Sequence, residues 1–109
     1  MPELPYTIDD MRAAVQNRRV LWRDHAVEKM LQREIRKQEV KECIFNGEIV
    51  EEYHTDRPFP SCLIFSYTEA NRPIHVVCSM NEGVLYIITA YEPNLFKWQE
   101  DYKTRRIKE

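Results

Sequence analysis

Residues 62–91, CLIFSYTEANRPIHVVCSMNEGVLYIITAY, decide the fold, because they hold three apolar runs rich in β-branched and aromatic residues. These runs cover residues 62–67, 74–80 and 84–91. A fourth run at 48–54 precedes them and is followed by a rigid turn at 56–60 that contains two prolines. Because the connections between consecutive runs are short, the pattern predicts a four-stranded antiparallel sheet.

The pairing of the last two runs depends on the loop between them. If residues 81–83 form a three-residue hairpin loop, Met80 pairs with Val84, and His75 lies opposite Thr89. A slip of one residue would turn the paired side chains to the opposite face of the sheet.

Apolar residues are expected on both faces of this sheet. One face carries Ile74, Val76, Cys78 and Met80, and the other carries Val77, Leu85 and Ile87. We expect the N-terminal helices to cover one face. The segment 93–98, a second copy of the chain or a protein partner remains to cover the other.

The first half of the chain has helical patterns. Thr7 and Asp10 resemble a capping pair at the start of a helix over residues 7–17. Asp24 is expected to cap a second helix. The apolar stripe of that helix consists of Val27, Met30, Leu31 and Ile35.

A third helix is expected to contain Val40 and Ile44 and to end at Asn46-Gly47, with Gly47 as a candidate left-handed terminator. The predicted fold class is therefore α+β, with N-terminal helices packed on the four-stranded antiparallel sheet. The whole chain, 1–109, is expected to be a single domain that has a core at 24–98 and a basic C-terminal tail at 99–109.

Composition narrows the class of protein. The chain has 109 residues, of which 43% are hydrophobic and 31% charged, values typical of one globular domain. Its apolar runs are too short to span a membrane and its start lacks a signal-peptide pattern, so we expect a cytoplasmic protein without a membrane partner. The three cysteines, at positions 43, 62 and 78, lack the spacing of metal ligands. We expect buried, reduced thiols, no metal site and no cofactor.

Charge is distributed unevenly along the chain. The net charge is −2, yet the two ends are basic and the middle is acidic. Any contact with RNA would depend on local clusters rather than on a general attraction. The candidate clusters are Arg18, Arg19 and Arg23 at one end, and Lys103, Arg105, Arg106 and Lys108 at the other.

Several short motifs occur in an order that carries a family resemblance. They are His25-Ala26, Met30 and Arg33, then GEIVE at 47–51, DRPFPS at 56–61, RPIHVV at 72–77, TAYEP at 89–93, and Trp98. Over residues 24–98 the chain resembles domain-of-unknown-function family 4258. One position departs from the pattern, because Glu34 stands where family members often have glycine.

That family resembles the compact bacterial ribonuclease toxins of the RelE/barnase-like fold group. The resemblance implies a RelE/BrnT-like fold and a toxin-antitoxin-type, metal-independent endoribonuclease or a relative of one. It also implies an RNA substrate and an antitoxin-like protein partner. A homo-oligomer is the alternative assembly.

Metal-independent RNA cleavage requires a base for the 2′-hydroxyl proton, a cation for the phosphate charge and an acid for the leaving oxygen. We take His25, at the start of its helix, as the candidate base. His75, Thr89 and Tyr91 share one sheet face in the predicted register and form the candidate acid and donor set. Arg33 is the candidate catalytic cation. The candidate substrate-binding residues are Arg72, Arg105 and Arg106.

Other interpretations of the same residues stay open. His75, between Ile74 and Val76, also fits a core histidine satisfied by a neighbouring hydroxyl such as that of Thr89. The alternative function is a non-enzymatic protein-binding module that uses an apolar sheet face. A sequence-tolerant nucleic-acid binder that uses the basic ends is a third hypothesis, which the net negative charge disfavours. An enzyme predicts His25, His75 and an arginine around one pocket, whereas a binding module predicts them buried or scattered.

Overall fold

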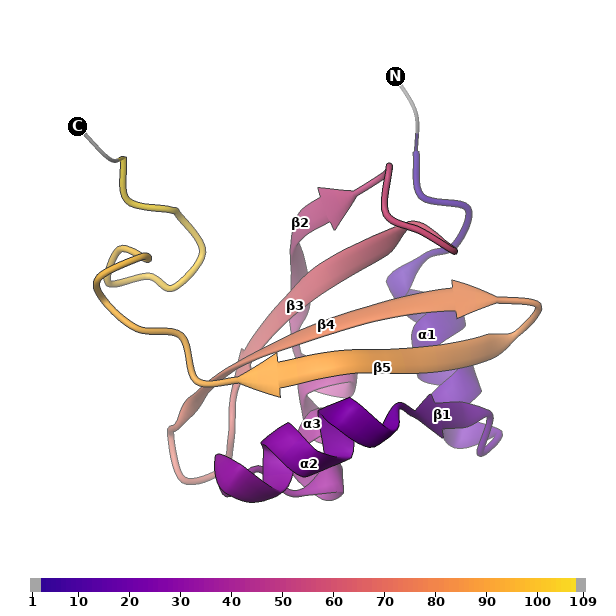
Figure 1. Cartoon of the computed structure of the whole chain (residues 1–109), viewed down its shortest axis with the longest axis horizontal. Coiled ribbons are helices and arrows are strands. Elements are labelled where there is room, and N and C mark those ends of the chain that lie inside the picture. The colour runs from indigo at the N-terminus through magenta and orange to yellow at the C-terminus, as the bar shows by residue number, and fades with distance from the viewer. Residues whose placement is uncertain (1–2, 108–109) are drawn as a thin grey trace.

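The computed structural model describes residues 3–107, which form three helices and one five-stranded sheet (Figure 1). The elements are α1 (Ile8–Gln16), β1 (Val20–Trp22), α2 (Asp24–Gln32), α3 (Lys37–Asn46), β2 (Glu48–Tyr53), β3 (Ser61–Tyr67), β4 (Pro73–Asn81) and β5 (Val84–Tyr91). The α+β class is confirmed. Lys108, predicted to be part of the C-terminal basic cluster, lies outside the described residues. Within the described chain, none of the helices is sufficiently long and apolar to span a membrane.

The sheet has the order β1-β5-β4-β3-β2 and is mixed, so the prediction of four antiparallel strands was incomplete. The pairs β2–β3, β3–β4 and β4–β5 are antiparallel, whereas β1 pairs in parallel with β5, with Val20 opposite Leu85 and Trp22 opposite Ile87. β1 is only three residues long. Such a short run has no periodicity to distinguish it from a linker, and its pairing partner lies far along the chain.

The predicted helix starts are confirmed in part. Thr7 and Asp10 form a reciprocal capping box at α1, in which each side chain accepts a hydrogen bond from the other residue's backbone N–H. At α2 the N-cap is Arg23, and Asp24 is the first helical residue, so the predicted Asp24 cap was wrong. An acidic residue in a first turn still stabilises the positive end of the helix.

Gly47 ends α3, but the predicted left-handed conformation was wrong, because its φ of −92° and ψ of −173° are those of extended backbone. Glycine is needed here for space. A Cβ at this position would lie only 2.5 Å from the Phe65 carbonyl oxygen and 2.9 Å from an Ile64 methyl group. The missing side chain lets α3 turn directly into β2 beside β3.

The β4–β5 turn corrects the predicted register. It has two residues, Glu82 and Gly83, whose φ angles of 50° and 78° are the two positive values that a type I′ turn requires. Met80 therefore pairs with Leu85 rather than with Val84. The shift of one residue puts Leu85 on the same face as Met80, opposite to the prediction, and the same correction applies to Ile87.

A β-bulge at Ile88 makes a second correction. Cys78 pairs with Ile87 and Val77 with Thr89, which leaves Ile88 without an opposite residue. His75 consequently pairs with Tyr91 instead of Thr89. Because the turn and the bulge each shift the register by one residue, Thr89 and Tyr91 still share the face of His75.

The helices lie on one side of the sheet, which we call the inner face (Figure 1). Its core combines Met11, Ala14, Ala26, Met30, Val40 and Ile44 from the helices with Cys62, Ile64, Ile74, Val76, Leu85 and Ile87 from the strands. The three cysteines are free and buried, as predicted, and burial raises the pKa of Cys43 to about 12.

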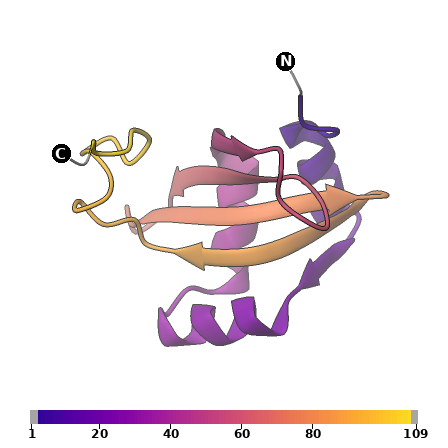
Figure 2. The ribbon, with the colours of Figure 1, turned by 45° about the horizontal axis from the view of Figure 1, so that its top comes forward.

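The opposite side, the outer face, is covered by two irregular segments. The β2–β3 loop crosses one end of it, where Phe59 contacts Tyr86, and the C-terminal segment 93–107 covers the other (Figure 2). Beneath this cover, Leu63 and His75 are completely buried, and Trp98 of the covering segment is 2% exposed. The sequence left three possible covers for this face: the segment 93–98, a second copy of the chain and a protein partner. In the structure the chain covers the face itself, with more residues than the predicted 93–98 segment.

Candidate functional site

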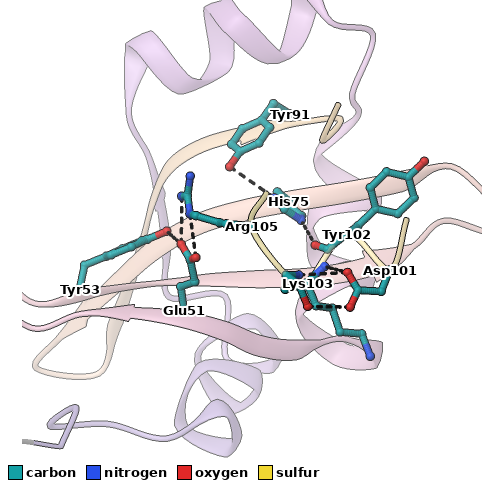
Figure 3. A network of polar contacts seen from close by, with 9 residues as sticks. Glu51, Tyr53, His75, Tyr91, Asp101, Tyr102, Lys103 and Arg105 are labelled. Carbon is teal, nitrogen blue, oxygen red and sulfur yellow. Dashed lines mark hydrogen bonds and ion pairs between the residues drawn. The ribbon is translucent and has the colours of Figure 1, made fainter. Parts of the chain in front are cut away.

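Polar side chains converge on the outer face beneath the C-terminal segment (Figure 3). The sheet register explains why. Glu51, Leu63, Val77 and Thr89 form one row across β2, β3, β4 and β5. Phe65, His75 and Tyr91 form the next row towards the carboxyl end of β5.

His75 is the buried centre of this cluster. Its Nε2 lies 2.7 Å from the Tyr102 carbonyl oxygen and its Nδ1 lies 3.3 Å from the Tyr91 hydroxyl. A carbonyl can only accept, so Nε2 carries the proton and Nδ1 accepts from Tyr91. The rings of Phe65, Tyr91 and Trp98 pack edge-on against the imidazole. Burial lowers the pKa of His75, which therefore favours the neutral form.

Glu51 forms the charged part of the cluster. Its carboxylate accepts two hydrogen bonds from the Arg105 guanidinium, at 2.8 and 3.0 Å, and one from the Tyr53 hydroxyl at 2.6 Å (Figure 3). Arg105 also stacks on Trp98, with its guanidinium carbon 4.5 Å from the ring centroid. The Arg105 hydrogen bonds lower the pKa of Glu51, so this carboxylate is ionised at neutral pH.

Tyr91 joins the buried and charged parts. Burial raises its pKa, an effect that the positive charges of Arg105 and Arg33 partly oppose. Arg33, at the end of α2, donates to the Ala90 carbonyl at 2.9 Å and to the Thr89 hydroxyl at 3.3 Å. The Tyr91 phenol thus keeps its proton at neutral pH in the field of two arginines.

The C-terminal segment brings Arg105 to this place through its own turn. Trp98 and Arg105 form an antiparallel bridge, and Gln99 donates to the Thr104 carbonyl. Asp101 closes the turn by accepting hydrogen bonds from the backbone N–H groups of Lys103 and Thr104 at 2.9 and 3.0 Å. This local order fixes the arginine relative to the tryptophan that anchors the segment on the sheet.

Comparison with known proteins supplies the family. The family described as Domain of unknown function (DUF4258) matches residues 22–92, well over half of the chain. The chain belongs to this family. Searches of curated proteins and of solved structures find no significant match. The DUF4258 span contains Arg33, Glu51, His75 and Tyr91, whereas Arg105 follows it.

Five of the predicted site residues lie together on the DUF4258 core: Arg33, His75, Thr89, Tyr91 and Arg105. The predictions from the sequence had divided them among the catalytic cation, the acid and donor set, and the substrate-binding residues. His25 is not part of this group. It is exposed in the first turn of α2, and about 12 Å of helix separates it from Arg33 at the other end.

Arg72 and Arg106 have structural partners. Arg72 donates to the Arg33 and Glu34 carbonyls at 2.6 and 2.7 Å and forms an ion pair with Glu92 at 2.8 Å. These bonds satisfy free carbonyls at the end of α2. Arg106 donates to the Leu95 carbonyl within the C-terminal segment.

Glu51, Tyr53 and Trp98 are the members of the cluster that the sequence did not assign to the site. Strand alternation places Glu51 and Tyr53 on one face, so their hydrogen bond could have been predicted from the sequence. The Arg105 partner could not, because the two residues are 54 positions apart and no strand pairing joins them.

Chemically, the cluster offers an ionised carboxylate, two arginines and a protonated phenol within one region of the sheet. A carboxylate can accept a proton, guanidinium groups can hold a phosphate, and a phenol can donate a proton. In the described part of the chain, no three His, Cys, Asp or Glu side chains gather as a metal site.

Proposed function

We propose that the chain is a metal-independent endoribonuclease of the RelE/barnase-like type. The observation that carries this proposal is the convergence of Glu51, Arg105 and Tyr91 on the outer face of the sheet. These residue types are the base, the phosphate-binding cation and the acid that cleavage through a 2′-hydroxyl needs.

In the proposed reaction Glu51 takes the proton of the 2′-hydroxyl, and the 2′-oxygen attacks the adjacent phosphorus. Arg105 and Arg33 bind the phosphate oxygens as negative charge develops on them. The bond from phosphorus to the 5′-oxygen breaks, and Tyr91 gives that oxygen its proton. The products are a 2′,3′-cyclic phosphate and a 5′-hydroxyl, and solvent returns the proton from Glu51 to Tyr91.

The Glu51–Arg105 pair connects substrate binding to basicity. In the free protein Arg105 holds two hydrogen bonds to Glu51, and these lower the pKa of the carboxyl group. A phosphate that draws Arg105 away raises that pKa and makes Glu51 a stronger base. His75 accepts the Tyr91 hydrogen bond and acts as a positioning residue, because its buried ring holds the phenol in place.

The test is cleavage of a fluorescently labelled RNA of mixed sequence, without divalent metal, by the full chain. We expect Glu51→Gln to lower kcat at least 100-fold, the lower end for loss of a general base. Glu52→Gln is the matched control, since Glu52 is the next residue on β2, lies opposite Cys62 and pairs with His54. Tyr91→Phe should also lower kcat, and Tyr67→Phe, at an exposed position on β3, should not.

Three results would contradict the proposal. They are equal activity of Glu51→Gln and parent, cleavage of a strand in which every 2′-hydroxyl is replaced by hydrogen, and no cleavage by the folded parent.

We further propose that the ribonuclease is held in check by an antitoxin-like protein. Induced expression of the parent should then arrest growth with loss of cellular RNA, whereas Glu51→Gln at equal abundance should not. Equal growth of both strains would contradict this part of the proposal.

A further inference from the structure

A second feature of the outer face lies at the end far from Arg105. Phe59 from the β2–β3 loop packs against Tyr86 of β5, with ring centroids 5.8 Å apart and ring planes 35° apart. Both aromatic residues are only half-buried. Tyr86 is in register with Leu21 on the edge strand β1, and Leu21 is 47% exposed. The protein therefore presents a partly open aromatic surface beside its sheet edge.

Positive charge borders this surface. Arg19 and Arg23 flank β1 and are exposed, and Arg57 is exposed two residues before Phe59. Within residues 3–107 these three side chains form no ion pair and no hydrogen bond, so their charges are available to a ligand. The nearby Asp56 carboxylate instead accepts a hydrogen bond from buried Ser61.

The same strand joins this surface to the catalytic cluster. Tyr86, Thr89 and Tyr91 share the outer face of β5, because the extra residue at the Ile88 bulge interrupts the alternation and turns Thr89 to the side of Tyr86. Five residues of strand span roughly 16 Å. A chain of a few nucleotides can therefore reach from the Phe59–Tyr86 pair to Glu51 and Arg105.

We infer that Phe59, Tyr86, Arg19 and Arg23 form a binding subsite for single-stranded RNA. Unpaired bases stack on the aromatic pair, and the arginines bind the flanking phosphates, as in other sequence-tolerant binders of single strands. This inference rests on the proposed function only in taking the same RNA as the occupant. It adds the residues that hold the strand outside the reacting nucleotide.

The first test measures binding of a labelled ten-nucleotide uridine RNA with 2′-O-methyl groups, which the enzyme cannot cleave. We expect Tyr86→Leu and Phe59→Leu to weaken binding roughly 5- to 150-fold, the equivalent of one stacked base. Tyr86→Phe should retain the affinity because it keeps the ring. The conservative variant thus separates loss of stacking from loss of folding.

The second test uses salt. Arg19→Gln combined with Arg23→Gln should flatten the slope of log affinity against log salt by about 1.4, the value for two phosphates on a single strand. Lys29→Gln combined with Lys41→Gln, on α2 and α3, removes the same charge elsewhere. An equal change in both double variants would overturn the inference, because binding would then follow net charge.

Further outcomes separate this subsite from the ribonuclease reaction. If the parent cleaves RNA and Tyr86→Leu binds as tightly as the parent, the subsite is wrong and the function stands. If the parent binds the probe through Tyr86 and cleaves nothing, the function is wrong and the subsite stands. Failure of the parent to bind the probe overturns the subsite, and a protein becomes the better occupant of the aromatic surface.

Discussion

The two faces of the sheet bury side chains of different kinds. The inner face is packed under helices, and its buried residues from β3, β4 and β5 are apolar, apart from two cysteines. The outer face is covered by a loop and the C-terminal segment, and its buried set includes Ser61, His75 and Ser79. A buried polar group must find hydrogen-bond partners, which fixes its position more strictly than apolar packing does. The inner face therefore provides stability, whereas the outer face provides defined geometry.

The covers also differ in how the chain supplies them. On the inner face, α3 runs directly into β2 and packs against β3, and α2 follows β1 and packs against β5. On the outer face, His75 is bonded to Tyr102, and Glu51 to Arg105. These contacts depend on a segment that follows the DUF4258 match. The site is thus built where a family core meets its C-terminal extension.

The largest expected effect comes from a truncation on the inner face. Leu85 is completely buried, so Leu85→Ala should lower the free energy of unfolding by about 3 kcal/mol, through lost transfer energy and a residual cavity. Urea unfolding followed by circular dichroism measures it. Leu31→Ala is the matched control, because Leu31 is 76% exposed and its loss should change stability by less than about 0.5 kcal/mol. Similar losses in the two variants would contradict the assignment of the core.

The inner face was also the better predicted one. Apolar spacing identified Met30 and Ile35 as core residues, but Leu31, predicted in the same stripe, is 76% exposed, and Ile35 follows the end of α2. The Thr7 and Asp10 pair placed the start of α1. Those signals are local, and each is complete within one or two helical turns. The misses came where geometry depended on turns and distant partners. A two-residue turn at Glu82-Gly83 changed the register between β4 and β5. Residues 20–22 form the strand β1 only through their pairing with β5, which is far along the chain.

The site was predicted only in fragments for the same reason. Alternation placed His75, Thr89 and Tyr91 on one face. That result holds because the turn and the bulge together shift the register by two residues, which returns each side chain to the same face. Glu51 could not be identified as a site residue from the sequence, because its role depends on Arg105 lying beside it. No local pattern encodes the path of the C-terminal segment back to the sheet.

Acid should destabilise the fold through a buried group on the outer face. Burial lowers the pKa of His75 in the folded chain. When the pH falls below about 6.5, the unfolded chain therefore binds a proton at this histidine before the folded chain does. Stability is therefore fully present above pH 6.5 and falls below it, by at most about 1.4 kcal/mol for each pH unit until the folded-state pKa is reached. His75→Gln should abolish this part of the pH dependence, whereas His54→Gln, on the half-exposed residue after β2, should retain it. Parallel pH profiles for parent and His75→Gln would show that the imidazole does not titrate as its burial requires.

The smallest effect concerns the junction between α2 and α3, where the helical cover of the inner face meets the Arg33 end of the site. Glu34 has a φ of 56°, a left-handed conformation that costs a residue with a Cβ about 1 kcal/mol. Arg72 contacts Glu34 through its backbone carbonyl, which glycine keeps. Glu34→Gly should therefore raise the free energy of unfolding by about 0.5 kcal/mol, after the entropy that glycine adds to the unfolded chain.

A glutamate inside α2 gives the matched comparison. Glu28 is exposed within α2, where glycine should cost about 1 kcal/mol because it weakens the helix. Opposite signs for Glu28→Gly and Glu34→Gly, measured by urea unfolding, would show that the break between the helices is held by their packing and by Arg72 despite an unfavourable residue. If both variants lose the same free energy of unfolding, the Glu34 side chain itself stabilises the junction. The left-handed backbone would then not be a source of strain.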